Sequence, residues 1–117
     1  MKVLVCGGRN YDDDVKVYQV LDWVNANKDF IDVIISGHAK GADTLGEWYA
    51  KDRKLEVEVY PAYWNKYGRA AGMIRNQQML DKGKPDLVVA FPGGRGTAGM
   101  MRIARAAGVE VMEIRDE

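Results

Sequence analysis

The sequence predicts a three-layer α/β fold in which a five-stranded, mainly parallel sheet in the order 3-2-1-4-5 carries helices on both faces. Short apolar runs alternate with stretches of helical periodicity along the whole chain, as in parallel sheets with crossover helices. The runs at 2–6, 31–35 and 87–91 are mainly apolar and do not alternate, as expected of strands covered on both faces. The runs at 55–60 and 109–114 alternate with glutamates, which places them at the sheet edges.

The connections between these strands are predicted from periodicity and from residues that start or stop helices. After the first strand, carboxylates at 12–14 favour a helix start, and apolar residues keep helical spacing through Asn25. After the second strand, Leu45 and Tyr49 lie on one face of another helix. The segment 61–69 holds three aromatic residues and no usable period, so we expect a long loop there.

Two further helices complete the pattern. The first runs from Ala71 to Lys82 and is stopped by Gly83 and Pro85. The second follows the fourth strand, and its apolar residues recur at i, i+3, i+4 and i+7, at Met100, Ile103, Ala104 and Ala107.

Length and composition limit the class of protein. We expect one domain over residues 1–117, because this length forms one core but not two. Seventeen basic and 17 acidic residues give no global field for a nucleic-acid duplex, so nucleic acid is not an expected partner and any anion site must be local. No apolar run reaches the roughly 20 residues needed to cross a membrane, and the first residues do not fit a signal peptide. We therefore expect a cytoplasmic protein with no membrane partner.

The cysteine and histidine content excludes other kinds of site. Cys6 is the single cysteine and ends an apolar strand, which predicts a buried thiol rather than a nucleophile. With one histidine and no Cys/His cluster, we expect no metal site, and no cofactor is indicated.

A glycine-rich turn at 92–97, with the sequence PGGRGT, joins the fourth strand to the last helix. Such a turn presents unpaired N–H groups and the positive end of the helix dipole, which attract an anion such as phosphate. A tight strand-to-helix connection would use the same glycines. Similar loops follow the first strand at 7–9 and the second at 36–43, and this repetition favours an anion site.

The predicted strand order brings these loops together. The sheet changes direction between strands 1 and 4, and ligands of open α/β sheets bind outside the carboxyl ends of the strands at that point. Forked guanidinium groups, a hydroxyl and backbone N–H groups are what phosphate requires. The candidate ligand-binding residues are Gly7, Gly8, Arg9, Ser36, Gly37, Gly41, Asp43, Arg75, Asn76, Pro92, Gly93, Gly94, Arg95, Gly96 and Thr97.

Aromatic residues provide a candidate wall for a nucleoside, and Asp43 or Asn76 a candidate ribose contact. Asp43 would equally serve as a helix N-cap, and His38 is interpreted as a loop residue rather than an acid or base. The candidate wall residues, some of which would also suit a sheet edge or a dimer contact, are Tyr11, Tyr63, Trp64 and Tyr67.

Four motifs resemble the YspA-like branch of the SLOG superfamily, which also includes the Lonely Guy (LOG) phosphoribohydrolases and the DNA-processing protein DprA. They lie at 7–13, 36–45, 68–79 and 90–97, and the resemblance covers nearly the whole chain. It implies a Rossmann-like fold whose glycine loops bind nucleotides or nucleotide-derived ligands. Such domains are often proposed to sense nucleotide signals in bacterial and phage conflict systems.

The resemblance to the LOG enzymes is incomplete at one position. Those enzymes pair an arginine with the glutamate of P-G-G-x-G-T-x-x-E and cleave the bond between a base and ribose 5′-monophosphate. Arg75 matches the arginine, but the motif here continues Ala98-Gly99-Met100, without the glutamate. Glu47 or Asp43 would have to replace it, so no residue is assigned a catalytic role and binding is favoured over catalysis.

Three hypotheses follow from the sequence. The first is a sensor or sequestering protein for a nucleotide or nucleotide-derived ligand, in which glycines and Thr97 cradle phosphate, arginines neutralise it and Asp43 binds ribose. The second is a LOG-type hydrolase with a relocated carboxylate. The third is a single-strand nucleic-acid binder resembling DprA, against which the zero net charge counts. The oligomeric state stays open, a homodimer included.

Overall fold

The computed structural model describes residues 1–115 and contains the predicted five-stranded sheet. At its centre β1 (Lys2–Cys6) pairs with β2 (Val33–Ser36) and β4 (Leu87–Ala90), while β3 (Glu56–Val59) and β5 (Glu110–Glu113) form the edges. Every pairing is parallel. The predicted fold class and the order 3-2-1-4-5 are therefore confirmed.

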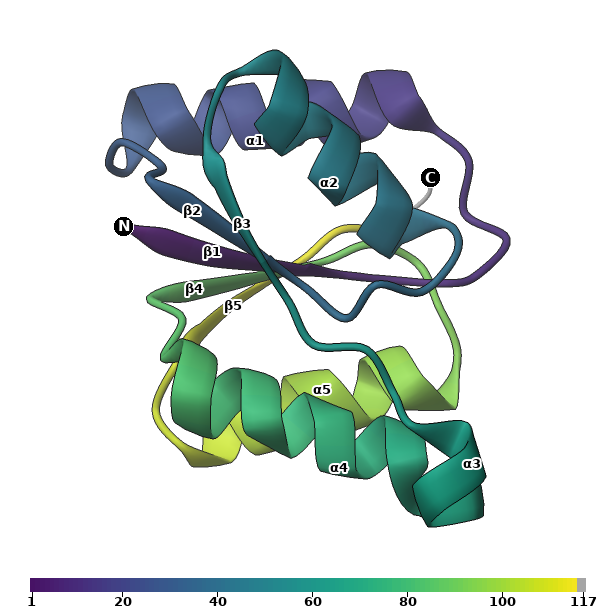
Figure 1. The fold of residues 1–117 in the computed structure, drawn as a ribbon. Helices are drawn as coiled ribbons and strands as arrows, with labels where there is room; N and C mark the ends of the chain where they lie inside the picture. The colour runs from purple at the N-terminus through teal and green to yellow at the C-terminus, as the bar shows by residue number, and fades with distance from the viewer. Residues whose placement is uncertain (116–117) are drawn as a thin grey trace.

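Helices cover both faces of the sheet (Figure 1). On one face lie α1 (Asp14–Asn27) and α2 (Ala42–Asp52). On the other lie α4 (Ala71–Gln78) and α5 (Arg95–Ala106), with the short α3 (Trp64–Tyr67) beside the start of α4.

The structure corrects the expectation of a loop over residues 61–69. One helical turn, α3, is closed by a 3.0 Å hydrogen bond from the Tyr67 N–H to the Tyr63 carbonyl, and a 3₁₀ turn follows at Gly68–Ala70. A single turn is too short to show a 3.6-residue period, so periodicity could not find it. Beyond α4 the chain continues through a π-helical turn, Met79–Gly83, close to the predicted helix end.

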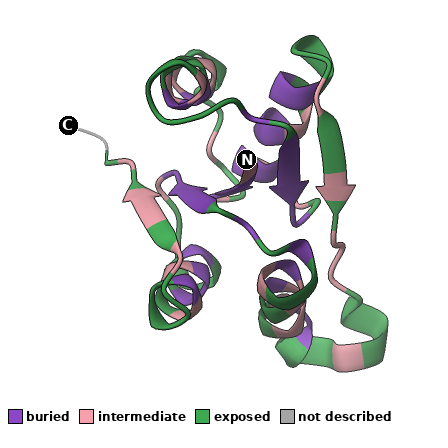
Figure 2. Ribbon diagram, turned by 90° about the vertical axis from the view of Figure 1, so that its left-hand side faces the viewer, coloured by how far each residue is buried: buried purple, intermediate pink, exposed green. Residues whose placement is uncertain are grey.

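The core consists of two apolar layers separated by the sheet. Successive residues of a strand point to opposite faces, so Val3 and Val5 pack toward α1 and α2, while Leu4 and Cys6 pack toward α4 and α5. The central strands are accordingly buried on both faces (Figure 2). This explains why their sequences are mainly apolar and do not alternate.

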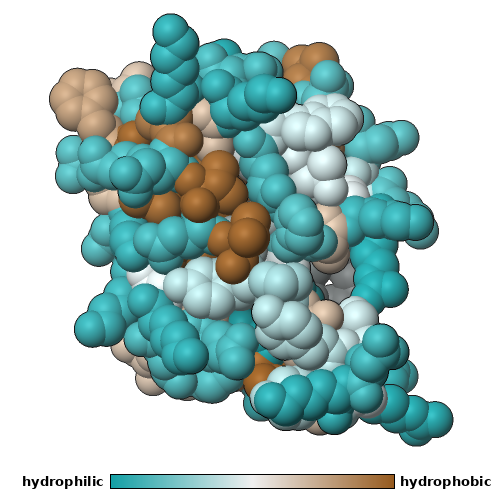
Figure 3. Space-filling model, viewed as in Figure 1, coloured by the Kyte–Doolittle hydropathy of each residue, from teal (hydrophilic) through white to brown (hydrophobic). Residues whose placement is uncertain are grey.

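The edge strand β3 is far less covered. Val57 and Val59 are 38% and 45% exposed, and hydrophobic side chains gather over this strand on the face seen in Figure 3. The alternation of valine and glutamate in β3 therefore reflects its edge position. Within residues 1–115, no helix has the length and apolar character required to span a membrane.

Candidate ligand-binding pocket

The loops that follow β1, β2 and β4 contact one another at the carboxyl ends of the strands. The Gly8 N–H donates a 2.8 Å hydrogen bond to the Pro92 carbonyl, and the Ala42 N–H donates one of 3.2 Å to the Gly8 carbonyl. The convergence predicted from topology is thus present in the structure.

Two glycines are required for this contact between loops. Gly41 has a φ of +79°, and a Cβ there would overlap the Gly8 carbonyl. A Cβ on Gly93 would overlap the Thr97 hydroxyl and lie 2.7 Å from the Gly8 nitrogen. These glycines therefore allow one loop to pack against another.

Gly94 and Gly96 have a different environment, because a Cβ on either would meet open space. Gly94 has a φ of −104°, which lies outside the left-handed region. Both glycines line a pocket of about 450 Å³.

The pocket brings together ten of the 15 candidate residues. They come from the loop after β1, the start of α2, α4 and the start of α5, and they are Gly7, Gly8, Arg9, Asp43, Arg75, Asn76, Gly94, Arg95, Gly96 and Thr97. The other five support the loops without lining the pocket: Ser36, Gly37, Gly41, Pro92 and Gly93.

Ser36 shows how these supporting residues act. Its side chain is fully buried, and its hydroxyl donates a 2.7 Å hydrogen bond to Glu47. The same hydroxyl accepts a 3.1 Å bond from the His38 N–H, and the His38 Nδ1 lies 3.0 Å from Glu47. Glu47 therefore fixes the β2–α2 loop and does not line the pocket.

Arg75 lies between this loop and α5. Its Nη1 donates a 2.5 Å hydrogen bond to the Gly37 carbonyl, and its Nε donates one of 3.0 Å to the Asn76 side chain. Burial lowers the pKa of Arg75, an effect opposed by the nearby Asp43 carboxylate. Arginine keeps its charge in proteins, so Arg75 places a positive charge at the pocket wall. Of its three guanidinium nitrogens, Nε and Nη1 donate the two bonds above, and Nη2 is the third.

Asn76 is held by protein groups on both sides of its amide. Its oxygen accepts from Arg75, and its nitrogen donates a 3.2 Å hydrogen bond to the Gly96 carbonyl. The side chain is 4% exposed. Its role in the structure is to join α4 to the start of α5, and a ribose contact would require these bonds to change.

Asp43 is the one carboxylate among the pocket-lining residues of the described chain. It is 6% exposed and accepts a 3.2 Å hydrogen bond from the Ala39 N–H. Burial raises its pKa to about 6, although the Ala39 N–H and the charge of Arg75 act in the opposite direction. Asp43 is therefore placed to change protonation state near neutral pH.

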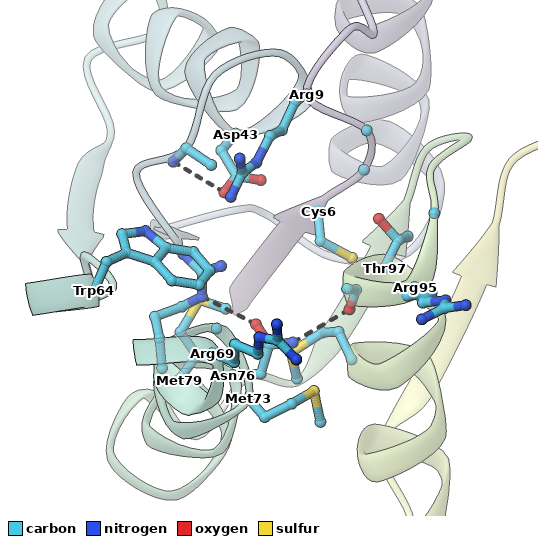
Figure 4. A pocket seen from close by; sticks show the side chains of 18 residues that line it. Cys6, Arg9, Asp43, Trp64, Arg69, Met73, Asn76, Met79, Arg95 and Thr97 are labelled. Atoms are coloured by element: carbon cyan, nitrogen blue, oxygen red, sulfur yellow. Dashed lines mark hydrogen bonds between the residues drawn. The ribbon is translucent and has the colours of Figure 1, made fainter. Parts of the chain in front are cut away.

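The amino end of α5 forms one end of the pocket (Figure 4). The helical hydrogen bonds of α5 begin with the bond of 3.0 Å from the Ala98 N–H to the Gly94 carbonyl. The N–H groups of residues 95–97 therefore have no acceptor within the helix. The predicted turn thus becomes helical at Arg95, two residues before its expected end. Four arginines line the pocket within residues 1–115, and they are Arg9, Arg69, Arg75 and Arg95.

Trp64 forms the opposite end of the pocket (Figure 4). The Cζ atom of Arg9 lies 5.5 Å from the centroid of its indole ring. The other candidate wall residues lie elsewhere: Tyr11 packs against Phe91 with ring centroids 5.4 Å apart, and Tyr63 is 57% exposed outside the lining.

Sequence reasoning missed seven lining residues of the described chain, most of them apolar, with the arginine of the 3₁₀ turn among them. Arg69 and Gly72 stood in a recognised motif, which was the available signal, but the methionines resembled ordinary core residues. Met100 occupies the position of the LOG glutamate and is 1% exposed. The lining residues not predicted are Cys6, Ala39, Arg69, Gly72, Met73, Met79 and Met100.

The remaining expectations concern Cys6 and metals. Cys6 is buried as predicted, and burial raises the pKa of its thiol. Among residues 1–115, no three His, Cys, Asp or Glu side chains are placed to hold a metal ion.

The fold and the pocket define a Rossmann-like α/β protein with a basic pocket at the carboxyl ends of its strands. Residues 1–67 match the sequence profile of the YspA, cpYpsA-related SLOG family (YAcAr), and the chain belongs to this family. It is similar to the Gene 61 protein of Mycobacterium phage D29, with 32% identity over 123 residues that cover 99% of this chain and 98% of that protein.

A solved structure shares the fold. The chain superposes on the DNA processing protein A (DprA) of Streptococcus pneumoniae with a TM-score of 0.77 and 20% identity. The match covers 99% of this chain and 50% of that one, so the chain spans about half the length of the DprA structure.

Proposed function

We propose that this protein binds a nucleotide or nucleotide-derived ligand, as a sensor or sequestering protein, in the pocket between α4, α5 and the loop after β1. The observation that carries the proposal is the excess of positive charge in a small pocket. Four arginines and one acidic residue line it within the described residues, although the whole chain has no net charge.

The phosphate is assigned to the end formed by α5. Free N–H groups and the dipole of a helix start favour an anion, and α5 spans 12 residues. Gly94 and Gly96 leave open space there, and Arg95 and Thr97 line the same end. A phosphate in this position would meet backbone donors, a hydroxyl and a guanidinium group.

The ribose is assigned to the middle of the pocket. Asp43 lies across from the helix start, on the loop side (Figure 4). Its Oδ2 accepts the Ala39 N–H, so Oδ1 is the atom assigned to a sugar hydroxyl. The pocket volume of about 450 Å³ lies in the range typical of small-molecule sites, about 300–1,000 Å³, which favours a small ligand over a nucleic-acid strand.

A thermal-shift panel with AMP, adenosine and inorganic phosphate tests this proposal. AMP should stabilise the protein, by about 2.7 kcal/mol at 100 times its Kd, while adenosine should do so only weakly. Arg95→Ala should weaken the response to AMP, and Arg102→Ala, an exposed arginine on the same helix outside the lining, should not. Equal responses to AMP and adenosine would contradict the phosphate assignment.

A further inference from the structure

We propose that Trp64 is the platform on which the ligand's aromatic base stacks, and that the base displaces Arg9 from the indole ring. This inference rests on the proposed function, since it places the base of a ligand whose phosphate lies at α5. It places the base at the Trp64 end of the pocket and the phosphate at the α5 end. It also makes Trp64 a residue that determines ligand specificity.

The first argument is the polarity of the pocket. Backbone donors and Thr97 lie at the α5 end, whereas Trp64 forms the opposite end (Figure 4). The flat face of an aromatic ring is suited to stacking with a base. The two ends therefore match the two chemical halves of a nucleotide.

The second argument is the way in which Trp64 is held. A Cβ on Gly72 would lie 3.4 Å from the indole Cη2 atom, at van der Waals contact, so the ring packs closely against this position of α4. Trp64 is nevertheless 47% exposed. A large aromatic side chain that is seated against one helix and open on the pocket side is available for stacking.

The third argument is that the Arg9 side chain lies over the indole ring of Trp64. Arg9 comes from the loop after β1, and its guanidinium lies over the indole across the pocket from α4. A cation–π contact at an exposed site is weaker than the stacking of a base on an aromatic side chain. A base can therefore replace the guanidinium on the indole ring. Arg9 is then free to pair with the phosphate of the ligand, so that binding of the base also brings a positive charge to the phosphate.

Calorimetric titrations of Trp64→Ala with AMP, GMP, CMP, UMP and ribose 5-phosphate test the inference. The variant should bind the preferred nucleotide at least about tenfold more weakly, while its affinity for ribose 5-phosphate stays unchanged. Trp64→Phe, which keeps an aromatic face, should retain most of the affinity. The control is Tyr63→Ala, a neighbour that is exposed and does not line the pocket.

A spectroscopic experiment does not depend on the stability of these variants. In the double variant W23F/W48F, Trp64 is the remaining tryptophan, and its fluorescence should be quenched by the nucleotide more strongly than by ribose 5-phosphate. If wild-type protein binds ribose 5-phosphate as tightly as every nucleotide, or if Trp64→Ala binds nucleotides normally, the base platform is overturned and the phosphate site stands. If none of these compounds binds, the proposed function itself fails.

Discussion

The Nη1 atom of Arg75 donates a 2.5 Å hydrogen bond to the Gly37 carbonyl and thereby joins α4 to the loop after β2. The bonds from Arg75 to Asn76 and from Asn76 to the Gly96 carbonyl extend this connection to the start of α5. Three segments far apart in the sequence are thus held around the pocket before any ligand binds. Such preorganisation reduces the ordering cost of binding.

Arg75→Ala should lower both ligand affinity and the stability of the free protein. Its loss leaves the Gly37 carbonyl and the Asn76 oxygen without their donor, and hydrogen bonds from charged groups contribute about 1.5–3 kcal/mol. We expect a loss of about 1–3 kcal/mol in the free energy of unfolding, measured by urea denaturation. Arg75→Lys should recover only part of this free energy, because one ammonium group cannot reproduce the guanidinium geometry that bonds both the Gly37 carbonyl and the Asn76 oxygen.

Arg69 provides the matched control for Arg75. It lines the same pocket on an exposed side chain, so Arg69→Ala should weaken AMP binding in calorimetry and leave the urea midpoint unchanged. An unchanged urea midpoint in Arg75→Ala would show that its hydrogen bonds do not stabilise the free pocket.

Gly93 and Gly94 should respond in opposite ways to the same substitution. A Cβ on Gly93 would overlap the Thr97 hydroxyl and the backbone of the loop after β1, so Gly93→Ala should lower the melting temperature. A Cβ on Gly94 would meet open space, and Gly94 lines the pocket, so Gly94→Ala should fold normally and bind AMP more weakly. Equal melting temperatures for the two variants would contradict this distinction.

Most of the fold could be predicted from sequence because burial determines the residue pattern. The central strands are mainly apolar and the edge strands alternate, and this difference predicted which strands form the centre and the edges of the sheet. The order in turn predicted that the loops after β1, β2 and β4 converge. Trp64–Tyr67 escaped detection because one turn of helix carries no period.

The pocket was less predictable than the fold, because residue type does not tell which side of a loop faces the pocket. Gly93 and Gly94 are neighbours with the same side chain, yet one packs against another loop and the other lines the pocket. Asn76 looked like a ligand contact, but its amide is bonded within the protein. Met73 and Met79 could not be separated from core methionines without the packing of α4 on α5.

Asp43 should make the stability of the free protein depend on pH. Its pKa of about 6 in the folded state lies above the ordinary value of about 3.9 for the unfolded chain, so the folded state binds more protons between these values. The contribution of Asp43 to the free energy of unfolding is therefore fully present below about pH 4 and falls as the pH rises through 6.

Asp43→Asn removes this titration while keeping an oxygen for the Ala39 N–H. The free energy of unfolding of the variant, relative to wild type, should increase by about 2–3 kcal/mol between pH 4 and pH 7. Urea denaturation of both proteins across this range measures the difference. A difference that does not change with pH would show that Asp43 ionises as an ordinary carboxyl group.

Cleavage of a nucleoside monophosphate should be absent. Breaking the bond between base and ribose builds positive charge on the sugar, which a nearby carboxylate stabilises. Met100 stands where the LOG motif has glutamate, and its thioether carries no charge. Asp43 is the remaining carboxylate of the pocket within residues 1–115, and it lies on α2 rather than on α5, where the LOG motif has its glutamate. Chromatography of AMP incubated with the protein should therefore detect no adenine above a no-enzyme control.

If adenine appears at ordinary enzymatic rates and Asp43→Asn abolishes its release while still binding AMP, the protein is a hydrolase with a relocated carboxylate, and the binding-only function is wrong.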